Sequence, residues 1–139
     1  MPPPSGIAFL LAQLGAQVSA GFAERLAPLD LRPSHVALLR LIAAHPGISQ
    51  QQLAELVGTV PSRVVKLLDE LEARGLIERR RSGTDRRKHE VRPAGDAAEQ
   101  LAEVRRVVAA HDAAVIAPLS QAERRTLLAL LQKVADRGP

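Results

Sequence analysis

The chain has 139 residues, of which 46% are hydrophobic, and it carries a net charge of +4. This length allows one core, or two small units that share one, and excludes two independent domains of ordinary size. The absence of cysteine excludes disulfides, thiolate chemistry and any cysteine-based zinc or iron–sulfur site.

The N-terminal part predicts a flexible tail over residues 1–5, followed by a long amphipathic helix. Ser5 is a suitable N-cap, and apolar residues then recur at every third or fourth position until Pro28 ends the helix. Pro33 is a favourable first helical residue and begins a second helix that runs to His45.

The apolar segment over residues 7–20 has to be distinguished from a secretory signal. No Lys or Arg precedes it, and Gln13 and Gln17 interrupt it, so we interpret it as part of the first helix. No stretch approaches the 18 or more apolar residues of a membrane span, and we expect a soluble, cytoplasmic protein.

Two helices joined by a tight turn are predicted next. Ser49 and Gln52 form a capping box at the start of a third helix, which ends where Gly58 takes a left-handed conformation. Pro61 starts a fourth helix, and Gly75 ends it, with the following leucine folding back in a Schellman arrangement. The apolar side of the fourth helix comprises Val64, Leu67, Leu68 and Leu71.

Positive charge is concentrated in residues 79–92, which contain seven cationic side chains against two carboxylates, while the rest of the chain sums to −1. This segment predicts a β-hairpin with two strands around the loop "SGTD". From Pro93 a fifth helix extends to about Pro118. Ser120 and Glu123 form a capping box for a last helix, whose inward residues are predicted to be Leu127, Leu131 and Val134.

The fourth helix presents donors and cations in its first turns. Ser62 and Lys66 point away from the apolar side and Arg63 flanks them, whereas the carboxylates come only in later turns. A helix whose N-terminal end meets a polyanion needs this distribution. Together with the cationic hairpin loop, which supplies Arg86, Arg87 and Lys88, the pattern indicates duplex DNA as the partner.

The run "ISQQQLAELVGTVPSRVVKLLDELEARGLIERRRSGTDRRKHEVRPAG" resembles the winged helix-turn-helix of the MarR family of bacterial transcriptional regulators. The most specific part is "LEARGLIER" followed by Asp85-Arg86-Arg87 and then "VRPAG". The resemblance implies a mainly α fold with a small β-hairpin wing, six helices and an intertwined homodimer. It divides the chain into dimerisation helices (6–32 and 93–139) and a DNA-binding lobe (33–92).

The resemblance also implies residue roles. Ser62, Arg63 and Lys66 would face base edges and phosphates, Arg87 would enter the minor groove, and Arg86 would contact a phosphate. Asp85 would orient the wing arginine, or it is a turn residue only. The complete candidate DNA-binding set is Ser49, Gln50, Pro61, Ser62, Arg63, Lys66, Arg81, Asp85, Arg86, Arg87 and Lys88. The implied function is a sequence-specific regulator, a repressor, that binds a pseudo-palindromic operator and is released by a small organic effector.

Two departures from the family stand out. Arg32 and Arg92 take positions where many members have a Ser or Thr cap, which weakens the caps of the second and fifth helices. The cysteine of the peroxide-sensing branch is missing, and that branch is excluded.

The alternatives differ in class. The same basic surface would serve a nonspecific architectural DNA-binding protein, whereas two Phe and no Tyr or Trp argue against RNA or single strands. The four histidines fall in no catalytic motif, so we do not expect an enzyme. We propose no zinc site at His35 or His45, and we interpret His111 as a hydrogen-bonded interface residue. The apolar sides of the first and fifth helices favour a dimer interface over internal core.

Overall fold

The computed structural model describes residues 1, 5–85 and 88–136. In these ranges six α-helices and a small antiparallel sheet follow one another, as the fold-class prediction requires. The helices are α1 (Ile7–Leu26), α2 (Pro33–Ala44), α3 (Gln50–Val57), α4 (Pro61–Ala73), α5 (Ala98–Val115) and α6 (Gln121–Ala135). A short 3-10 turn, Ala27–Leu29, follows α1. The strands are β1 (Ile48–Ser49), β2 (Ile77–Arg81) and β3 (His89–Pro93).

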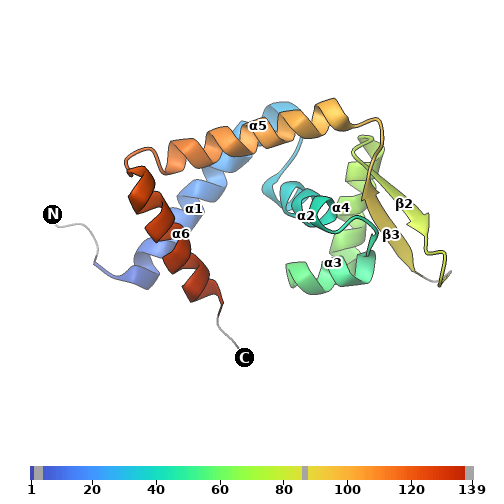
Figure 1. Ribbon diagram of the computed structural model, residues 1–139, viewed down its shortest axis with the longest axis horizontal. Coiled ribbons are helices and arrows are strands. Elements are labelled where there is room, and N and C mark those ends of the chain that lie inside the picture. The colour runs from blue at the N-terminus through green and yellow to red at the C-terminus, as the bar shows by residue number, and fades with distance from the viewer. Residues whose placement is uncertain (2–4, 86–87, 137–139) are drawn as a thin grey trace.

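The helices form two regions connected by α5 (Figure 1). At one end of α5, helices α2, α3 and α4 pack with the sheet into a lobe; toward the other end lie the N-terminal half of α1 and α6. The hydrophobic core belongs mainly to the lobe, where fully buried residues include Leu38, Ile42, Leu53, Leu68 and Leu71. This core fixes α4 and the hairpin relative to each other.

Local capping explains where the lobe helices begin and end. The Ser49 hydroxyl accepts a hydrogen bond from the backbone N–H of Gln52, whose side chain accepts one from the backbone N–H of Ser49, and this confirms the predicted capping box. Gly75 has φ +71°, and the N–H of Leu76 donates to the carbonyl of Leu71 at 3.1 Å. The Schellman ending of α4 is thereby confirmed.

The sheet has the strand order β1-β3-β2, with both pairings antiparallel. The hairpin register pairs Arg79 with Val91 and Arg81 with His89. The two-residue strand β1 was not predicted from the sequence, because so short an edge strand is defined only by its pairing with β3. It ties the start of α3 to the wing.

Two predicted helix starts were wrong. α5 begins at Ala98 instead of Pro93, because Pro93 is still paired with Ile77 and the N–H of Ala94 donates to the carbonyl of Leu76. Arg92 therefore lies in β3 and is no helix cap. At the N-terminus, Gly6 and not Ser5 occupies the N-cap position of α1, without a side-chain hydrogen bond.

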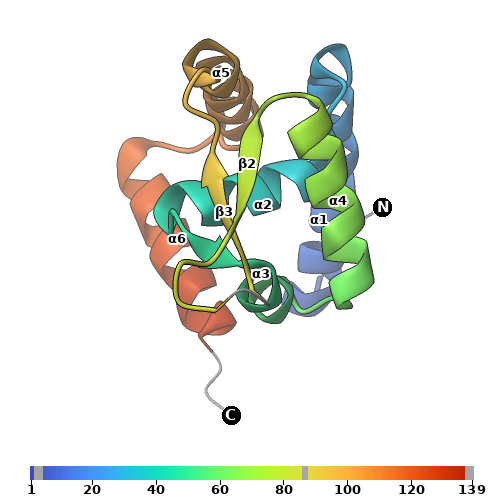
Figure 2. The same cartoon turned by 90° about the vertical axis from the view of Figure 1, so that its right-hand side faces the viewer.

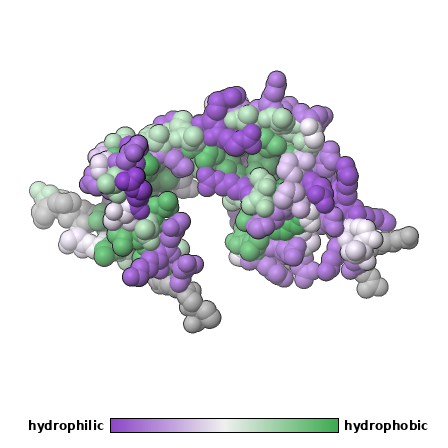
Figure 3. All heavy atoms as spheres, viewed as in Figure 1, coloured by the Kyte–Doolittle hydropathy of each residue, from purple (hydrophilic) through white to green (hydrophobic). Residues whose placement is uncertain are grey.

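Apolar side chains remain exposed on α1 and α6. On α6 no residue is buried within the single chain, and the residues predicted to point inward are 38–42% exposed. The space-filling view shows hydrophobic side chains gathered on this part of the molecule (Figure 3). Contrary to the sequence expectation, residues Ile7–Leu29 are long and apolar enough to cross a membrane by length and composition alone, with a mean hydropathy of 1.3.

Candidate nucleic-acid interface

In Figure 2, α4 stands beside α3 and the hairpin, with its last turn leading into β2 at the top of the view and its first turns at the lower end, level with α3. Pro61 occupies the first helical turn, and Ser62, Arg63 and Lys66 are all exposed. The helix thus carries two cations near its N-terminal end and three carboxylates in its later turns, as the sequence indicated.

A hollow of about 360 Å³ lies between the start of α3, the start of α4 and the start of β3. It brings together four of the predicted site residues, and these are Ser49, Gln50, Pro61 and Lys88. Residues that are 39 positions apart in the chain, counted from Ser49 to Lys88, thus share one surface feature. Neither Ser49 nor Gln50 is fully exposed, and the Ser49 hydroxyl is already engaged as the cap of α3.

The wing supplies the remaining predicted residues. Arg81 is exposed at the end of β2. The carbonyl of Asp85 accepts a hydrogen bond from the N–H of Lys88 at 3.0 Å. The backbone of Asp85 therefore helps to form the connection between β2 and β3. Arg86 and Arg87, with their predicted phosphate and minor-groove roles, lie outside the described residues.

Arg79 has a different role from its neighbours. Its side chain is 17% exposed and donates to Asp69 and Glu72 on α4 and, through Nη1, to Oε1 of Gln50 at 3.2 Å. Donation to Glu72 is the main cause that raises the pKa of Arg79, and it lowers the pKa of Glu72 in turn. Arg79 is therefore an internal clamp between the wing, α3 and α4.

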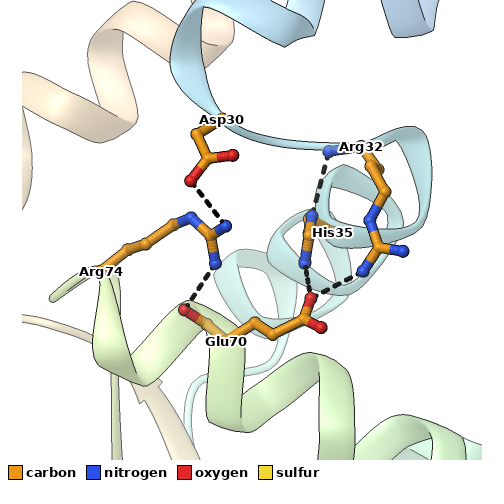
Figure 4. Close-up of polar contacts among 5 residues, drawn as sticks. All are labelled: Asp30, Arg32, His35, Glu70 and Arg74. Atoms are coloured by element: carbon orange, nitrogen blue, oxygen red, sulfur yellow. Dashed lines mark hydrogen bonds and ion pairs between the residues drawn. The ribbon is translucent and has the colours of Figure 1, made fainter.

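A second polar cluster anchors α4 from the other side (Figure 4). Glu70 Oε2 contacts Nε2 of His35 at 2.6 Å and Nη2 of Arg32 at 2.7 Å. Arg74 donates to the carbonyl of Glu70 and to Asp30, which follows the 3-10 turn. These contacts join the later turns of α4 to the connector between α1 and α2 and to the first turn of α2.

His35 also repairs the cap that Arg32 leaves incomplete. Nδ1 of His35 accepts a hydrogen bond from the backbone N–H of Arg32 at 3.0 Å, whereas an arginine side chain has no acceptor with which to cap. Since Nδ1 accepts, Nε2 carries the proton and donates to Glu70. The third residue of α2 thus caps the start of its own helix. This arrangement was not predicted from the sequence.

Burial favours the neutral form of this histidine. Burial is the main cause that lowers the pKa of His35 from 6.5; the hydrogen bond to Glu70 opposes it, and Arg32 and Arg74 reinforce it. The pKa of Glu70 is lowered mainly by the hydrogen bond from His35. At neutral pH the pair is thus a neutral imidazole that donates to a carboxylate.

Three residues that line the hollow were missed by sequence reasoning, and these are Gln51, Val65 and His89. Val65 could have been found, because it is apolar and lies off the inward stripe of α4, next to Lys66. Gln51 and His89 carry no such signal. They reach the hollow only because β1 and β3 pair.

His111 on α5 is buried, and its ring stacks on Phe22 of α1 with 4.8 Å between centroids. Its Nε2 has no hydrogen-bond partner within the described part of the chain. A hydrogen bond from a partner subunit stays a prediction. In residues 1, 5–85 and 88–136, no cluster of three or more His, Asp or Glu is placed to hold a metal ion.

The two helices α3 and α4, the turn at Gly58 and the hairpin beside α4 define a winged helix-turn-helix protein. A model of the MarR family matches residues 29–88. The chain is 37% identical over 102 residues to a putative transcriptional regulatory protein for the hcr operon of Thauera aromatica. That match covers 73% of the chain and 61% of the Thauera protein, so the chain spans about six-tenths of this relative's length.

Solved structures agree with this classification. The transcriptional repressor CouR, bound to a 23-mer DNA duplex, is 31% identical with a TM-score of 0.85, and the match covers 94% of this chain and 92% of CouR. A MarR family protein of Mycobacterium tuberculosis, in complex with p-aminosalicylic acid, is 25% identical with a TM-score of 0.75, covering 95% and 100%. The chain belongs to the MarR family.

Proposed function

We propose that the protein is a sequence-specific regulator of transcription that binds double-stranded DNA and represses the genes it controls. The observation that carries the proposal is the exposed start of α4, where Ser62, Arg63 and Lys66 lie beside the hollow shared with α3 and the wing. A helix of this kind fits the major groove, and the wing would follow the adjacent minor groove and its phosphates. We therefore call α4 the recognition helix.

Internal ion pairs support this orientation. Carboxylates close to the phosphates would repel DNA, but Asp69 and Glu72 are paired with Arg79, and Glu70 is paired with Arg32. Glu70 also accepts a hydrogen bond from the neutral His35. The cations near the start of α4 then dominate the field that a duplex meets. The CouR structure, with its DNA duplex, is consistent with this use of the fold.

The regulator would act as a homodimer through α1, α5 and α6. Large apolar side chains on α1 and α6 are exposed in the single chain, among them Leu14 (52%), Leu128 (58%) and Leu130 (55%). A second copy would cover them, and this explains the apolar character of Ile7–Leu29 in a cytoplasmic protein better than a membrane does. Two recognition helices related by a two-fold axis would read half-sites about one helical turn apart.

A small organic effector is the second part of the proposal. A hollow of about 280 Å³ lies between the connector after α1, the end of α4 and α5, and Leu29, Leu31, Leu76 and Val104 give it a mainly apolar lining. Arg74 borders it and also contacts the carbonyl of Glu70, so an occupant there could shift the recognition helix. The Mycobacterium tuberculosis relative with its bound aromatic acid supports an effector of this size.

Fluorescence anisotropy tests the proposal. Purified protein is titrated onto labelled duplex from upstream of its own gene and onto a scrambled duplex of equal composition, over a range of salt concentrations. We expect tighter binding to the native duplex and a steep loss of affinity with salt, because phosphate contacts release counterions. If this duplex is not preferred, selection from a pool of random duplexes shows whether the protein prefers any sequence, and the titration is repeated on the selected duplex. Equal affinity for all duplexes would favour the nonspecific architectural role.

A further inference from the structure

The hollow between α3, α4 and β3 has two chemically different sides. Pro61 and Val65 provide its apolar part; they are four residues apart in α4 and so lie on the same face of that helix. Gln50, Lys88 and their neighbours provide polar groups. An apolar surface beside hydrogen-bond donors matches a base edge that carries both a methyl group and an acceptor, whereas a phosphate offers acceptors and no apolar group.

Val65 is placed to touch what enters this hollow. It is partly buried, whereas Val64 and Leu68 on the inward stripe of α4 are fully buried. Its neighbour Lys66 is exposed, as are Ser62 and Arg63. A duplex that meets these cations would therefore bring base edges to Val65.

The orientation of Gln50 follows from Arg79. Nη1 of Arg79 donates to Oε1 of Gln50 at 3.2 Å, and arginine has no acceptor, so the amide oxygen and not the amide nitrogen faces Arg79. Asp69 and Glu72 hold Arg79 in turn. The amide NH₂ of Gln50 takes no part in this contact, and Gln50 lines the hollow, so we assign the NH₂ as the donor there.

We propose that this hollow reads a thymine in each half-site: its C5-methyl group packs on Val65 and Pro61, and its O4 accepts a hydrogen bond from the Gln50 amide. Thymine is the unmodified base that combines a methyl group with an acceptor at the major-groove edge. Cytosine would present an N4 donor to the Gln50 donor and no methyl group. The inference rests on the proposed function, because it requires α4 in the major groove.

Base analogues test the two contacts separately. On the duplex preferred by the protein, each thymine is replaced in turn by deoxyuridine, which removes the methyl group and keeps O4. A second series replaces T·A by 5-methylcytosine·G, which keeps the methyl group and turns the acceptor into a donor. We expect one position per half-site where deoxyuridine weakens binding about fourfold, the effect of one buried methyl group, and where 5-methylcytosine weakens it by about fivefold or more.

Protein variants assign the methyl contact to Val65. Val65→Ala should reduce the fourfold difference between the thymine and deoxyuridine duplexes, because only Pro61 is left to pack on the methyl group. Val57→Ala is the matched control, since Val57 is 38% exposed at the end of α3 and does not line the hollow; it should keep the fourfold difference. Thermal unfolding shows that each variant is folded, and the analogue series on the unaltered protein needs no variant.

The outcomes separate the inference from the proposed function. Sequence-specific binding with no thymine sensitive to loss of its methyl group would overturn the inference and leave the regulator intact. A fourfold difference between the thymine and deoxyuridine duplexes that persists unchanged in Val65→Ala would also overturn the inference and leave the regulator intact. Equal binding to native, selected and scrambled duplexes would overturn the proposed function, and the thymine contact with it.

Discussion

Nε2 of His35 lies 2.6 Å from Oε2 of Glu70 and joins the first turn of α2 to the recognition helix. The same ring accepts the backbone N–H of Arg32, so one neutral imidazole both caps α2 and anchors α4. Because the side chain is 1% exposed, neither hydrogen bond can be replaced by water without rearrangement. Protonation of His35 would remove the acceptor at Nδ1 and break the cap of α2, whereas Nε2 would still donate to Glu70 on the recognition helix.

Stability should fall as the pH drops below about 6.5. The pKa of His35 is lowered in the folded protein, so the unfolded chain binds this proton first, and the contribution is complete above 6.5 and lost as the pH falls through the folded-state pKa. The slope from this one group reaches at most about 1.4 kcal/mol per pH unit. The lowered pKa of Glu70 adds a further loss below about 4.5.

Urea unfolding of the unaltered protein and of His35→Leu from pH 8 to pH 5 measures how much His35 contributes to the free energy of unfolding at each pH. At pH 8 the variant should be less stable by about 1–3 kcal/mol, because the Arg32 N–H loses its acceptor and Glu70 loses one of its two hydrogen-bond donors. The difference should shrink toward pH 5. Ser34→Ala in the same turn changes no titratable group and should leave the slope unaltered. A pH-independent difference would contradict the role assigned to the imidazole.

The features that sequence predicted well are those set by neighbouring residues. The capping boxes at Ser49 and Ser120 and the Schellman ending at Gly75 depend on residues within five positions, and all three are present. Pro93 was misassigned because a proline suits both the first turn of a helix and the end of a strand, and only pairing with Ile77 decides.

The anchoring of α4 could not be predicted. His35 and Glu70 are 35 positions apart, and Arg79 and Gln50 are 29 apart, so only the folded chain brings them together. Within residues 79–92, all arginines look alike in the sequence. The fold separates an internal clamp at Arg79 from exposed residues at Arg80 and Arg81.

Adjacent arginines should therefore respond differently to substitution. Arg79→Ala leaves Asp69 and Glu72 without their shared cation and should cost about 1–3 kcal/mol, because the guanidinium is 17% exposed. Arg80 is 70% exposed and pairs with Glu78, so Arg80→Ala should change stability by no more than about 0.5 kcal/mol. Chemical denaturation of both variants measures the two stability losses. Equal losses would show that Arg79 is no clamp.

A charge on α6 should dissociate the proposed dimer. Leu128→Glu places a carboxylate where an apolar interface is expected, since Leu128 is 58% exposed in the single chain. Leu56→Glu is the matched control, because Leu56 is 60% exposed but lies on α3 in the DNA-binding lobe. Sedimentation equilibrium should give a monomer mass for the first variant and a dimer mass for the second. A dimer that survives Leu128→Glu would place the interface elsewhere.

Removal of Lys66 should reduce the salt dependence of DNA binding. Lys66 is exposed near the start of α4, where its ammonium group would replace counterions at a phosphate. Lys66→Ala should lower the slope of log affinity against log salt by about 1 for each protomer. Lys133→Ala on α6 removes the same charge outside the DNA-binding lobe and should leave the slope unchanged. Equal slopes for both variants would mean that α4 does not meet the DNA backbone at Lys66, whereas equal reductions would reveal an effect of net charge alone.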